Sequence, residues 1–180
     1  MQVTEQARRN QITRATIEVI AEHGYRRTSF AQIVAHAGLS STRLISYHFN
    51  GKDDLMMSVL IAAIGTVDEV MTARLAEVTD RTEMLRSYIE TQVDLLRTHP
   101  DQIKAIREIT TNVPDLQPVL RDFRTGRLER QLTQGQREGT FGTFNVTVMA
   151  RTIANGIDAA TAEPDYGPEL ADLFIRACAA

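Results

Sequence analysis

The sequence has little of several residue types that define whole classes of protein. Its 180 residues include no tryptophan and a single cysteine, and aromatic residues make up 6% of the chain. One cysteine, Cys178, cannot form an intrachain disulfide, which is typical of a protein from a reducing compartment. Few aromatic residues beside a steady supply of Ala, Leu, Ile, Arg and Glu favour helices.

Long hydrophobic runs are missing as well. The most apolar stretch, residues 55–64, is shorter than the roughly 20 residues that cross a bilayer, and Asp68 and Glu69 follow it. The first residues are polar (TEQARRNQ) and lack the apolar segment of a signal peptide. We therefore expect a cytoplasmic protein with no membrane partner.

Groups that perform catalysis or bind metals are sparse. The four histidines are scattered, and the chain has no glycine-rich phosphate loop and no recognisable pairing of a nucleophile with a base. His36 and His48 lack a Cys, Asp or Glu partner at ligand spacing, which argues against a metal site. We expect no metal and no cofactor, and an enzyme on a helical scaffold is a disfavoured alternative.

Charge is distributed unevenly along the chain. Residues 1–52 contain seven Lys or Arg and three Asp or Glu, a net charge of +4, whereas the remainder carries −7. A basic N-terminal part on an acidic body is typical of a protein that docks on DNA through that part. Arg8 and Arg9 lie off the apolar stripe of the first helix, so they are either solvated or in contact with phosphates.

Residues 28–52 have the pattern of two short helices joined by a tight turn. We expect the first helix over residues 29–36, the turn at residues 37–39 and the second helix over residues 41–49. Ser29 and Gln32 form a capping-box pattern, and Ser40 is the expected N-cap of the second helix. Two helices joined through a glycine turn form the helix-turn-helix pattern of DNA-binding proteins.

The second of these helices has a polar face that suits a DNA major groove. Helical spacing places Thr42, Arg43 and Ser46 on the outer side, opposite Leu44 and Ile45. Arg43 is the side chain there that can grip a guanine with two hydrogen bonds. An ordinary solvated helix face is the alternative interpretation. The predicted DNA-binding residues are Thr28, Ser29, Ser40, Ser41, Thr42, Arg43, Ser46, Tyr47, His48 and Lys52.

Helical periodicity continues through the rest of the chain, without a period-two run that would mark a strand. We predict an all-α fold of about nine helices, with a three-helix head over residues 1–51 and a helical body over residues 52–180. The segment GTFGTFN is expected to be a turn or loop. The predicted helices cover residues 4–23, 29–36, 41–49, 52–78, 82–98, 101–112, 116–138, 145–162 and 168–179.

The N-terminal part of the chain resembles the TetR family of transcriptional regulators. The resemblance covers about fifty residues and depends on an ordered set of motifs. These are Ile12-Thr-Arg-Ala15, Glu22-His-Gly24-Tyr25, Thr28-Ser29, Ile33-Val34-x-x-Ala37-Gly38-Leu39-Ser40 and Tyr47-His48-Phe49-x-x-Lys52-Asp-Asp-Leu55.

The second helix departs from the family pattern by one residue. Counting forward from Gly38 places the family's small recognition-helix residue at Thr42, whereas counting backward from Phe49 places it at Arg43. Which of Thr42, Arg43 and Leu44 faces the groove therefore stays open. The capping pattern favours Thr42 and Arg43.

The resemblance implies a homodimer that binds a near-palindromic operator and represses transcription. Residues 1–51 would form the helix-turn-helix DNA-binding domain, and residues 52–180 the effector-binding and dimerisation domain. A small-molecule effector would tilt the long fourth helix and change the spacing of the two heads. The alternative is a helical interaction protein, or an activator, with the same fold and no gating by a small molecule.

Two sets of body residues are candidates for these roles. Mostly polar residues on otherwise apolar helices could line the effector pocket, and among them Arg107 suits an anionic effector unless it pairs with an acid such as Glu108 or lies at the surface. The pocket candidates are Tyr88, Gln92, Arg107, Thr111, Asn112, Phe123, Thr152, Asn155 and Asp158. Apolar residues of the last two helices could form either the dimer interface or an intrachain core. The interface candidates are Val146, Met149, Ala150, Ile153, Ile157, Leu170, Leu173 and Phe174.

Overall fold

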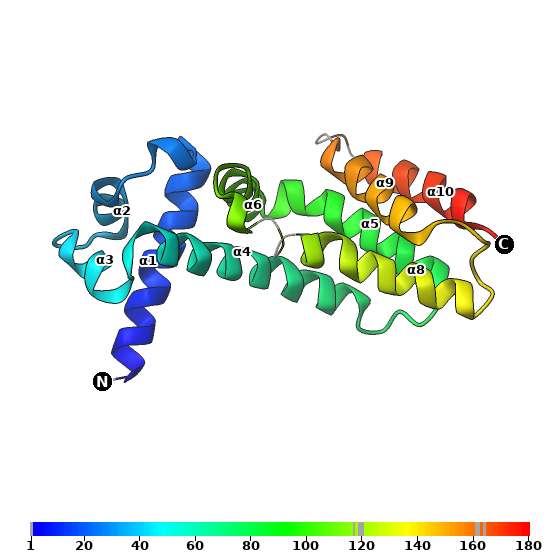
Figure 1. Cartoon of the computed structure of the whole chain (residues 1–180), viewed down its shortest axis with the longest axis horizontal. Helices are drawn as coiled ribbons and strands as arrows, with labels where there is room; N and C mark the ends of the chain where they lie inside the picture. The colour runs from blue at the N-terminus through cyan, green and yellow to red at the C-terminus, as the bar shows by residue number, and fades with distance from the viewer. Residues whose placement is uncertain (1, 117, 119–120, 161–162, 164) are drawn as a thin grey trace. The chain divides into compact units, whose positions relative to one another are not determined.

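The structure, a computed structural model, describes the chain apart from residues 1, 117, 119–120, 161–162 and 164 (Figure 1). In the described part, helices and turns account for the regular structure, and a lone antiparallel bridge joins Phe141 to Ala179 in place of a strand. The predicted all-α fold class is confirmed.

The elements follow one another in an order close to the predicted one. They are α1 (Gln2–His23), the 3-10 turn η1 (Tyr25–Arg27), α2 (Phe30–Ala37), α3 (Arg43–His48), α4 (Gly51–Leu75), α5 (Arg81–Thr98), α6 (Pro100–Asn112), the 3-10 turn η2 (Pro114–Leu116), the π-helical turn η3 (Asp122–Gly126), α8 (Arg127–Arg137), α9 (Val146–Asp158) and α10 (Tyr166–Cys178).

The prediction of one continuous α-helix over residues 116–138 is wrong. The π-helical turn η3 ends at Gly126, and the regular helix α8 begins only at Arg127. Glycine weakens an α-helix because ordering its backbone costs more entropy, and a π-turn is a common form of local interruption. Residues 117 and 119–120 of this prediction lie outside the described residues. The predicted helix over 145–162 ends earlier, at Asp158.

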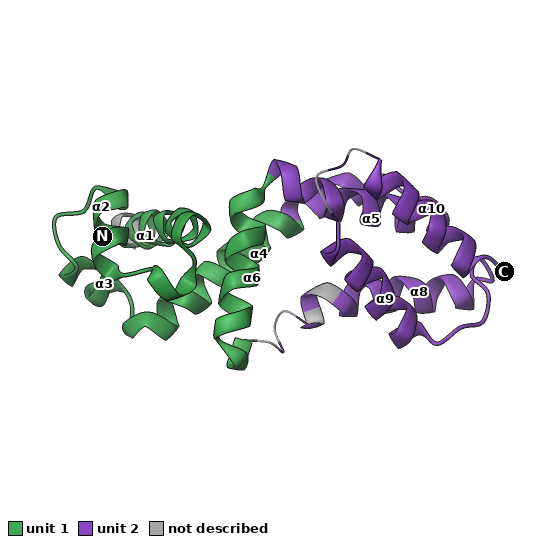
Figure 2. Cartoon of the chain, turned by 90° about the horizontal axis from the view of Figure 1, so that it is seen from above, with its two compact units in different colours: residues 1–68, 99–116 green, residues 69–98, 117–180 purple. Residues whose placement is uncertain are grey.

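The chain forms two compact units (Figure 2). Unit 1 comprises residues 1–68 and 99–116, and unit 2 comprises residues 69–98 and 117–180. Helix α4 runs through both units, and α6 belongs to the same unit as α1, α2 and α3. The predicted division between a DNA-binding domain and an effector domain after residue 51 concerns function, so it stays a prediction.

Unit 1 is built around α1, which packs against α2, α3 and α6. The apolar stripe predicted on α1 is confirmed, since Ile12, Val19 and Ile20 are buried. Ile33 of α2 and Ile45 of α3 are buried as well. One buried side chain from each short helix thus fixes the helix-turn-helix unit to the core.

Unit 2 has its own core, to which α5, α8, α9 and α10 all contribute. The core includes Leu85 and Ile89 of α5, Leu132 of α8, Ile153 of α9 and Phe174 of α10. Cys178 is buried among them, and this burial raises the pKa of its thiol to about 11. A thiol of that pKa stays protonated and unreactive at neutral pH, which agrees with a packing role.

Helix α4 is long and apolar enough, by length and composition alone, to cross a membrane. One face of the helix belongs to the core, because Leu55, Val59, Ala63 and Val67 are fully buried or nearly so. A core helix of a folded protein passes the same test of composition. Packing therefore explains part of the hydrophobicity of α4, of which Ile61 is exposed.

A close approach between α8 and the GTFGTFN segment yields a test of core packing. A methyl group added at Gly135 would lie 2.2 Å from a ring carbon of Phe141. Gly135→Ala is therefore expected to lower the free energy of unfolding by about 1–3 kcal/mol through overpacking. The control is Gly65→Ala in α4, where nothing lies within 4 Å of the new methyl group, and it should stabilise the protein by about 0.5–1 kcal/mol. Urea denaturation measures both, and a Gly135→Ala protein as stable as the wild type would contradict the packing.

Candidate nucleic-acid interface

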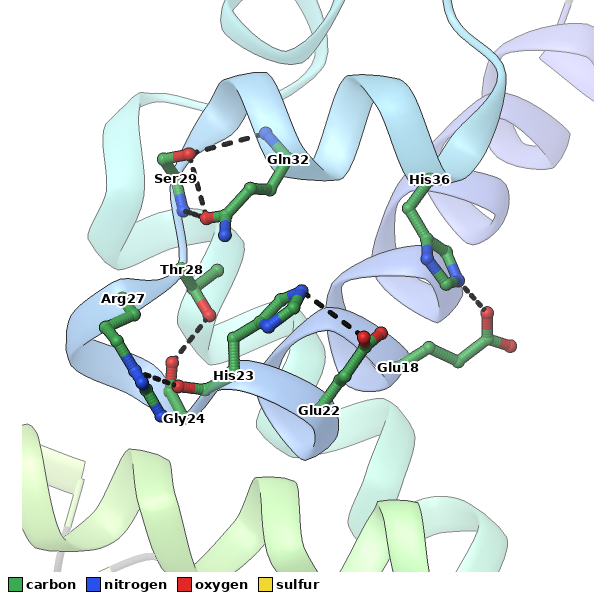
Figure 3. Close-up of polar contacts among 9 residues, drawn as sticks. All are labelled: Glu18, Glu22, His23, Gly24, Arg27, Thr28, Ser29, Gln32 and His36. Carbon is green, nitrogen blue, oxygen red and sulfur yellow. Dashed lines mark hydrogen bonds and ion pairs between the residues drawn. The ribbon is translucent and has the colours of Figure 1, made fainter.

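The first helix of the helix-turn-helix unit is capped at both ends. Ser29 Oγ accepts a hydrogen bond from the Gln32 backbone N–H at 3.3 Å, and Gln32 Oε1 accepts one from the Ser29 backbone N–H at 2.9 Å (Figure 3). This reciprocal pair is the predicted capping box. At the other end Gly38 has a φ of 64°, a left-handed conformation that glycine adopts without strain. The two caps set where α2 begins and where the turn starts.

The prediction that Ser40 caps the second helix is wrong. The backbone N–H of Arg43 donates to Ser41 Oγ at 3.0 Å, and α3 begins at Arg43. Thr42 precedes the helix with helical backbone angles and no capping hydrogen bond from its side chain. The helix is therefore shorter than predicted and starts later, because Ser41 takes the role expected of Ser40.

The outward face of α3 carries the predicted side chains. Thr42, Arg43 and Ser46 are exposed, and Tyr47 has 78% of its surface accessible. Leu44 is half-buried. This arrangement places both Thr42 and Arg43 outward, so it agrees with either count along the family pattern. Ser29 and Ser40 are also exposed, and Ser41 is half-buried.

Three other residues predicted to touch DNA are buried or half-buried, and two of them have partners inside the protein. Thr28 is buried and its Oγ1 donates to the carbonyl of Gly24 at 2.9 Å, so its contact with DNA is not supported (Figure 3). Lys52 is half-buried with its Nζ 4.3 Å from the centre of the Tyr25 ring. His48 is half-buried and its Nδ1 is a buried atom without a hydrogen-bond partner among the described residues. A phosphate would have to compete with the ring of Tyr25 for Lys52.

Arg9 has a role that the sequence did not reveal. Its guanidinium donates a hydrogen bond to the carbonyl of His48, at the end of α3, and another to Ser58 Oγ in α4 at 3.3 Å. The same group lies 4.2 Å from the centre of the Phe49 ring. Arg9 thus joins α1, α3 and α4, and two of its five N–H donors bond within the protein. A cation at the C-terminus of a helix also stabilises the helix dipole.

The end of α2 is fixed to α1 by a pair of titratable side chains. His36 Nε2 lies 2.6 Å from Glu18 Oε2 (Figure 3). Arg14 Nε lies 3.2 Å from the other oxygen of Glu18. The hydrogen bond with His36 lowers the pKa of Glu18, and Arg14 lowers it further. The stabilisation from a carboxyl with a lowered pKa is present above its ordinary pKa and is lost as the pH falls through the lowered value.

The residues predicted to line an effector pocket are divided between the two units. Unit 1 holds Arg107, Thr111 and Asn112, of which Arg107 and Thr111 are exposed and Asn112 accepts a hydrogen bond from Arg26. In unit 2 the side chains differ in burial. Tyr88 belongs to the core, Gln92 and Phe123 are half-buried, and Thr152, Asn155 and Asp158 are exposed.

A cavity of about 780 Å³ in unit 2 is lined by a different set of side chains. It lies among the end of α4, the face of α5 and the start of α10. Its lining residues are Val70, Ala73, Arg74, Glu90, Thr91, Val93, Asp94, Leu96, Arg97, Glu163, Gly167 and Pro168. Periodicity indicated that polar residues lie on apolar helices, but it could not indicate which of them share a space.

Half of the predicted dimer interface belongs to the core of unit 2. The residues Ala150, Ile153, Ile157 and Phe174 are buried there, and Val146, Met149 and Leu170 are partly buried against them. The large apolar side chains of α9 and α10 that remain exposed are Val148, with 60% of its surface accessible, and Leu173, with 53%. The prediction for the four buried residues is corrected, because α5 and α8 cover them within one chain.

The sequence of the helix-turn-helix unit matches a family model. Residues 12–59, which run from the first buried turn of α1 into α4, match the bacterial regulatory proteins of the tetR family. Residues 12–59 therefore form a domain of the tetR family. The family resemblance noted in the sequence is thereby confirmed, and the matched residues include the capping box, the glycine turn and the whole of α3.

A transcriptional regulator is similar to this chain over a longer stretch. The HTH-type transcriptional regulator BetI 1 of Chromohalobacter salexigens is 30% identical over 118 residues, which are 63% of this chain and 58% of that regulator. The match thus spans less than two thirds of the relative's length.

Solved structures of transcriptional regulators share the fold over almost the whole chain. A TetR transcription regulator from Haloarcula marismortui superposes with a TM-score of 0.82 at 20% identity, over 97% of this chain and 100% of that one. The fatty acid degradation regulator FadR of Bacillus halodurans gives 0.79 at 20% identity, over 93% and 94% of the two chains. At such identities the likeness shows the arrangement of helices.

The position of Arg9 allows a structural role to be separated from a phosphate contact. Arg9→Met removes the bond to the His48 carbonyl, and we expect the free energy of unfolding to fall by about 1.5–3 kcal/mol, as for a hydrogen bond to a charged group. Arg8→Met is the matched control, because Arg8 Nη1 only reaches Gln11 on the same exposed face. Urea denaturation checks the expectation, and equal stabilities for the two variants would show that Arg9 does not hold α3.

Proposed function

We propose that this TetR-family protein is a sequence-specific repressor that binds a near-palindromic operator as a homodimer in the cytoplasm and is released by a small-molecule effector. The observation that carries the proposal is the outward face of α3. Thr42, Arg43 and Ser46 are exposed there, while Ile45 fixes the opposite side to the core. Short polar side chains with one guanidinium among them fit a major groove and can bond to base edges.

The charge of the N-terminal part supports the same function. Residues 1–52 carry a net charge of +4, although the chain as a whole carries −3. Electrostatic attraction to phosphates supplies most of the non-specific affinity for DNA and weakens steeply with salt. The basic residues would attract the duplex, and the face of α3 would select the sequence.

A homodimer follows from the geometry of operator DNA. Two recognition helices can enter successive major grooves on one side of the duplex when they are about 34–36 Å apart. An effector that binds a conformation with a different spacing lowers DNA affinity by its differential affinity for the two states, typically about 1–3 kcal/mol. A coupling of this size is enough to release a regulator whose concentration is close to its dissociation constant for the operator.

The cavity in unit 2 is the place that we propose for the effector. Its volume of about 780 Å³ falls within the range of small-molecule sites. Apolar residues such as Val70 and Leu96 line it together with the charged Arg74 and Arg97. Arg97 Nη2 lies 2.8 Å from Asp94 Oδ1, so an anionic effector would compete with Asp94 for this cation. The lining suits a small amphipathic molecule.

The decisive test is a gel shift with DNA from the promoter beside the protein's own gene, at two salt concentrations. A shift that weakens with salt is expected, and the absence of such a shift on every fragment would refute the function.

Arg43→Ala should weaken operator binding by about 1–3 kcal/mol and relax the preference at one base position. Arg130→Ala in α8, an exposed residue of unit 2, removes the same charge and should leave binding unchanged. A uniform loss across operator variants would instead make Arg43 a phosphate contact.

The exposed apolar residues of α9 and α10 allow a test of the homodimer. Leu173→Glu and Val148→Glu would each place a charge in the proposed interface, and we expect dissociation into monomers with weaker operator binding. Sedimentation velocity measures the oligomeric state. Ile61→Glu in α4 is the control, because Ile61 is similarly exposed, at 58%, but lies in unit 1. Dimers of unchanged stability in the first two variants would exclude this face.

A further inference from the structure

The turn η1, which joins α1 to the helix-turn-helix unit, is bonded to α6 by two side chains. Glu108 Oε2 accepts a hydrogen bond from the Tyr25 backbone N–H at 2.8 Å. Asn112 Oδ1 accepts one from Arg26 Nε at 3.0 Å, and Asn112 Nδ2 donates to the carbonyl of Glu108 at 2.8 Å. Residues four apart lie on the same face of a helix. One face of α6 therefore holds two consecutive residues of η1.

The geometry at Gly24 makes this contact possible. Gly24 has a φ of 79°, and a methyl group added there would lie 3.3 Å from Glu108 Oε2. The N–H of Gly24 bonds to the carbonyl of Ile20, which closes α1, so the next N–H, that of Tyr25, needs an acceptor from elsewhere. Glu108 provides a charged acceptor, and hydrogen bonds to charged groups are the stronger kind.

The turn η1 is itself tied together, so that it can transmit a displacement. The Thr28 N–H donates to the carbonyl of Tyr25 at 3.2 Å. Thr28 Oγ1 donates to the carbonyl of Gly24 at 2.9 Å, and Arg27 Nε donates to that of His23 at 2.9 Å (Figure 3). Ser29, the cap of α2, follows directly. The direction of η1 therefore sets the direction in which α2 starts.

Helix α6 is connected to unit 2 at both of its ends. The chain leaves unit 2 after Thr98, where α5 ends, and α6 begins at Pro100. The chain enters unit 2 again at residue 117, shortly after η2. A rearrangement in unit 2 that displaces either end of α6 would therefore act on the bonds to η1.

We propose that Glu108 and Asn112 form a latch through which α6 positions the helix-turn-helix unit for specific DNA binding. The two are positioning residues, which act through Tyr25 and Arg26 and make no contact with DNA. The proposal rests on the proposed function as a DNA-binding regulator. It identifies the part of the DNA-binding unit through which the effector-binding unit would control it.

The test compares Glu108→Ala with Glu108→Gln in the full-length protein, by amide exchange at Tyr25 and by DNA affinity. Glu108→Ala removes the acceptor, so the Tyr25 amide should exchange faster and operator affinity should fall about ten-fold, as for the loss of a strong hydrogen bond. Affinity for non-specific duplex and the salt dependence should not change, because no phosphate contact is lost. Glu108→Gln keeps an oxygen acceptor and should retain most of the operator affinity.

Two further variants complete the experiment. Asn112→Ala removes the bonds to Arg26 and to the Glu108 carbonyl but keeps the bond between Glu108 and the Tyr25 amide. It should reduce operator affinity several-fold less than Glu108→Ala does, which provides a readout if Glu108→Ala unfolds. Glu22→Gln is the charge control, because Glu22 is an exposed carboxylate at the end of α1 and its loss changes the net charge as Glu108→Gln does. Binding by Glu22→Gln should equal that of the wild type.

The outcomes separate the two proposals. Failure of the wild type to bind any promoter fragment refutes the DNA-binding function itself. Wild-type operator affinity in Glu108→Ala, together with fast exchange at Tyr25, overturns the latch and leaves the function intact. An equal loss on operator and non-specific DNA, or an equal loss in Glu108→Gln and Glu22→Gln, also overturns it, because either result assigns the effect to charge. Loss of specific binding alone, with rescue by glutamine, supports the latch.

Discussion

The proposed DNA-binding surface depends on holding in place a helix that would not be stable alone. Helix α3 has six residues, whereas isolated helices shorter than about 12–15 residues are marginal in water. Its order must come from its surroundings. Ile45 and Phe49 are buried in the core of unit 1, Ser41 accepts the first orphan N–H, and Arg9 bonds to the last carbonyl. Specificity in such a protein is therefore a property of the packing around α3 as much as of its exposed side chains.

Several cations of the basic N-terminal part serve the structure. Arg9 joins three helices, Arg26 bonds to Asn112, Arg14 pairs with Glu18, and Lys52 lies over the ring of Tyr25. The net charge of this part still attracts DNA at a distance, because long-range fields depend on the charge and little on its hydrogen bonds. Contacts at close range are different, since a guanidinium that already bonds to a carbonyl has fewer donors left for a phosphate.

Local features were predictable from the sequence, and features that depend on a distant partner were not. The capping box at Ser29 and the turn at Gly38 involve residues within one helical turn, so residue type and spacing were sufficient. The role of Arg9 depends on a carbonyl 39 residues away, and backbone carbonyls have no sequence signature. Ser40 was mistaken for the cap because Ser41 offers the same hydroxyl one position later.

Burial patterns have a similar limit, because an apolar face shows that a helix is covered without showing what covers it. The face of α9 that contains Ala150 and Ile153 packs within its own chain, which leaves Val148 on a second face.

Helix α6 shows how chain order can hide a contact between distant parts of the sequence. Its residues lie about a hundred positions after the start of the chain, beyond α5 of unit 2, yet it packs against α1 and bonds to η1. A regulator of the proposed kind needs an element that packs within the DNA-binding unit and is connected along the chain to the unit proposed to bind the effector. Helix α4 satisfies this condition because it runs through both units, and α6 satisfies it because both of its ends lead into unit 2.

Control through α6 would reach the start of α2 by way of η1. Control through α4 would reach the end of α3 by way of Ser58 and Arg9. The two ends of the helix-turn-helix unit are thus held by different elements, and a rearrangement that moves only one of these elements would rotate the unit.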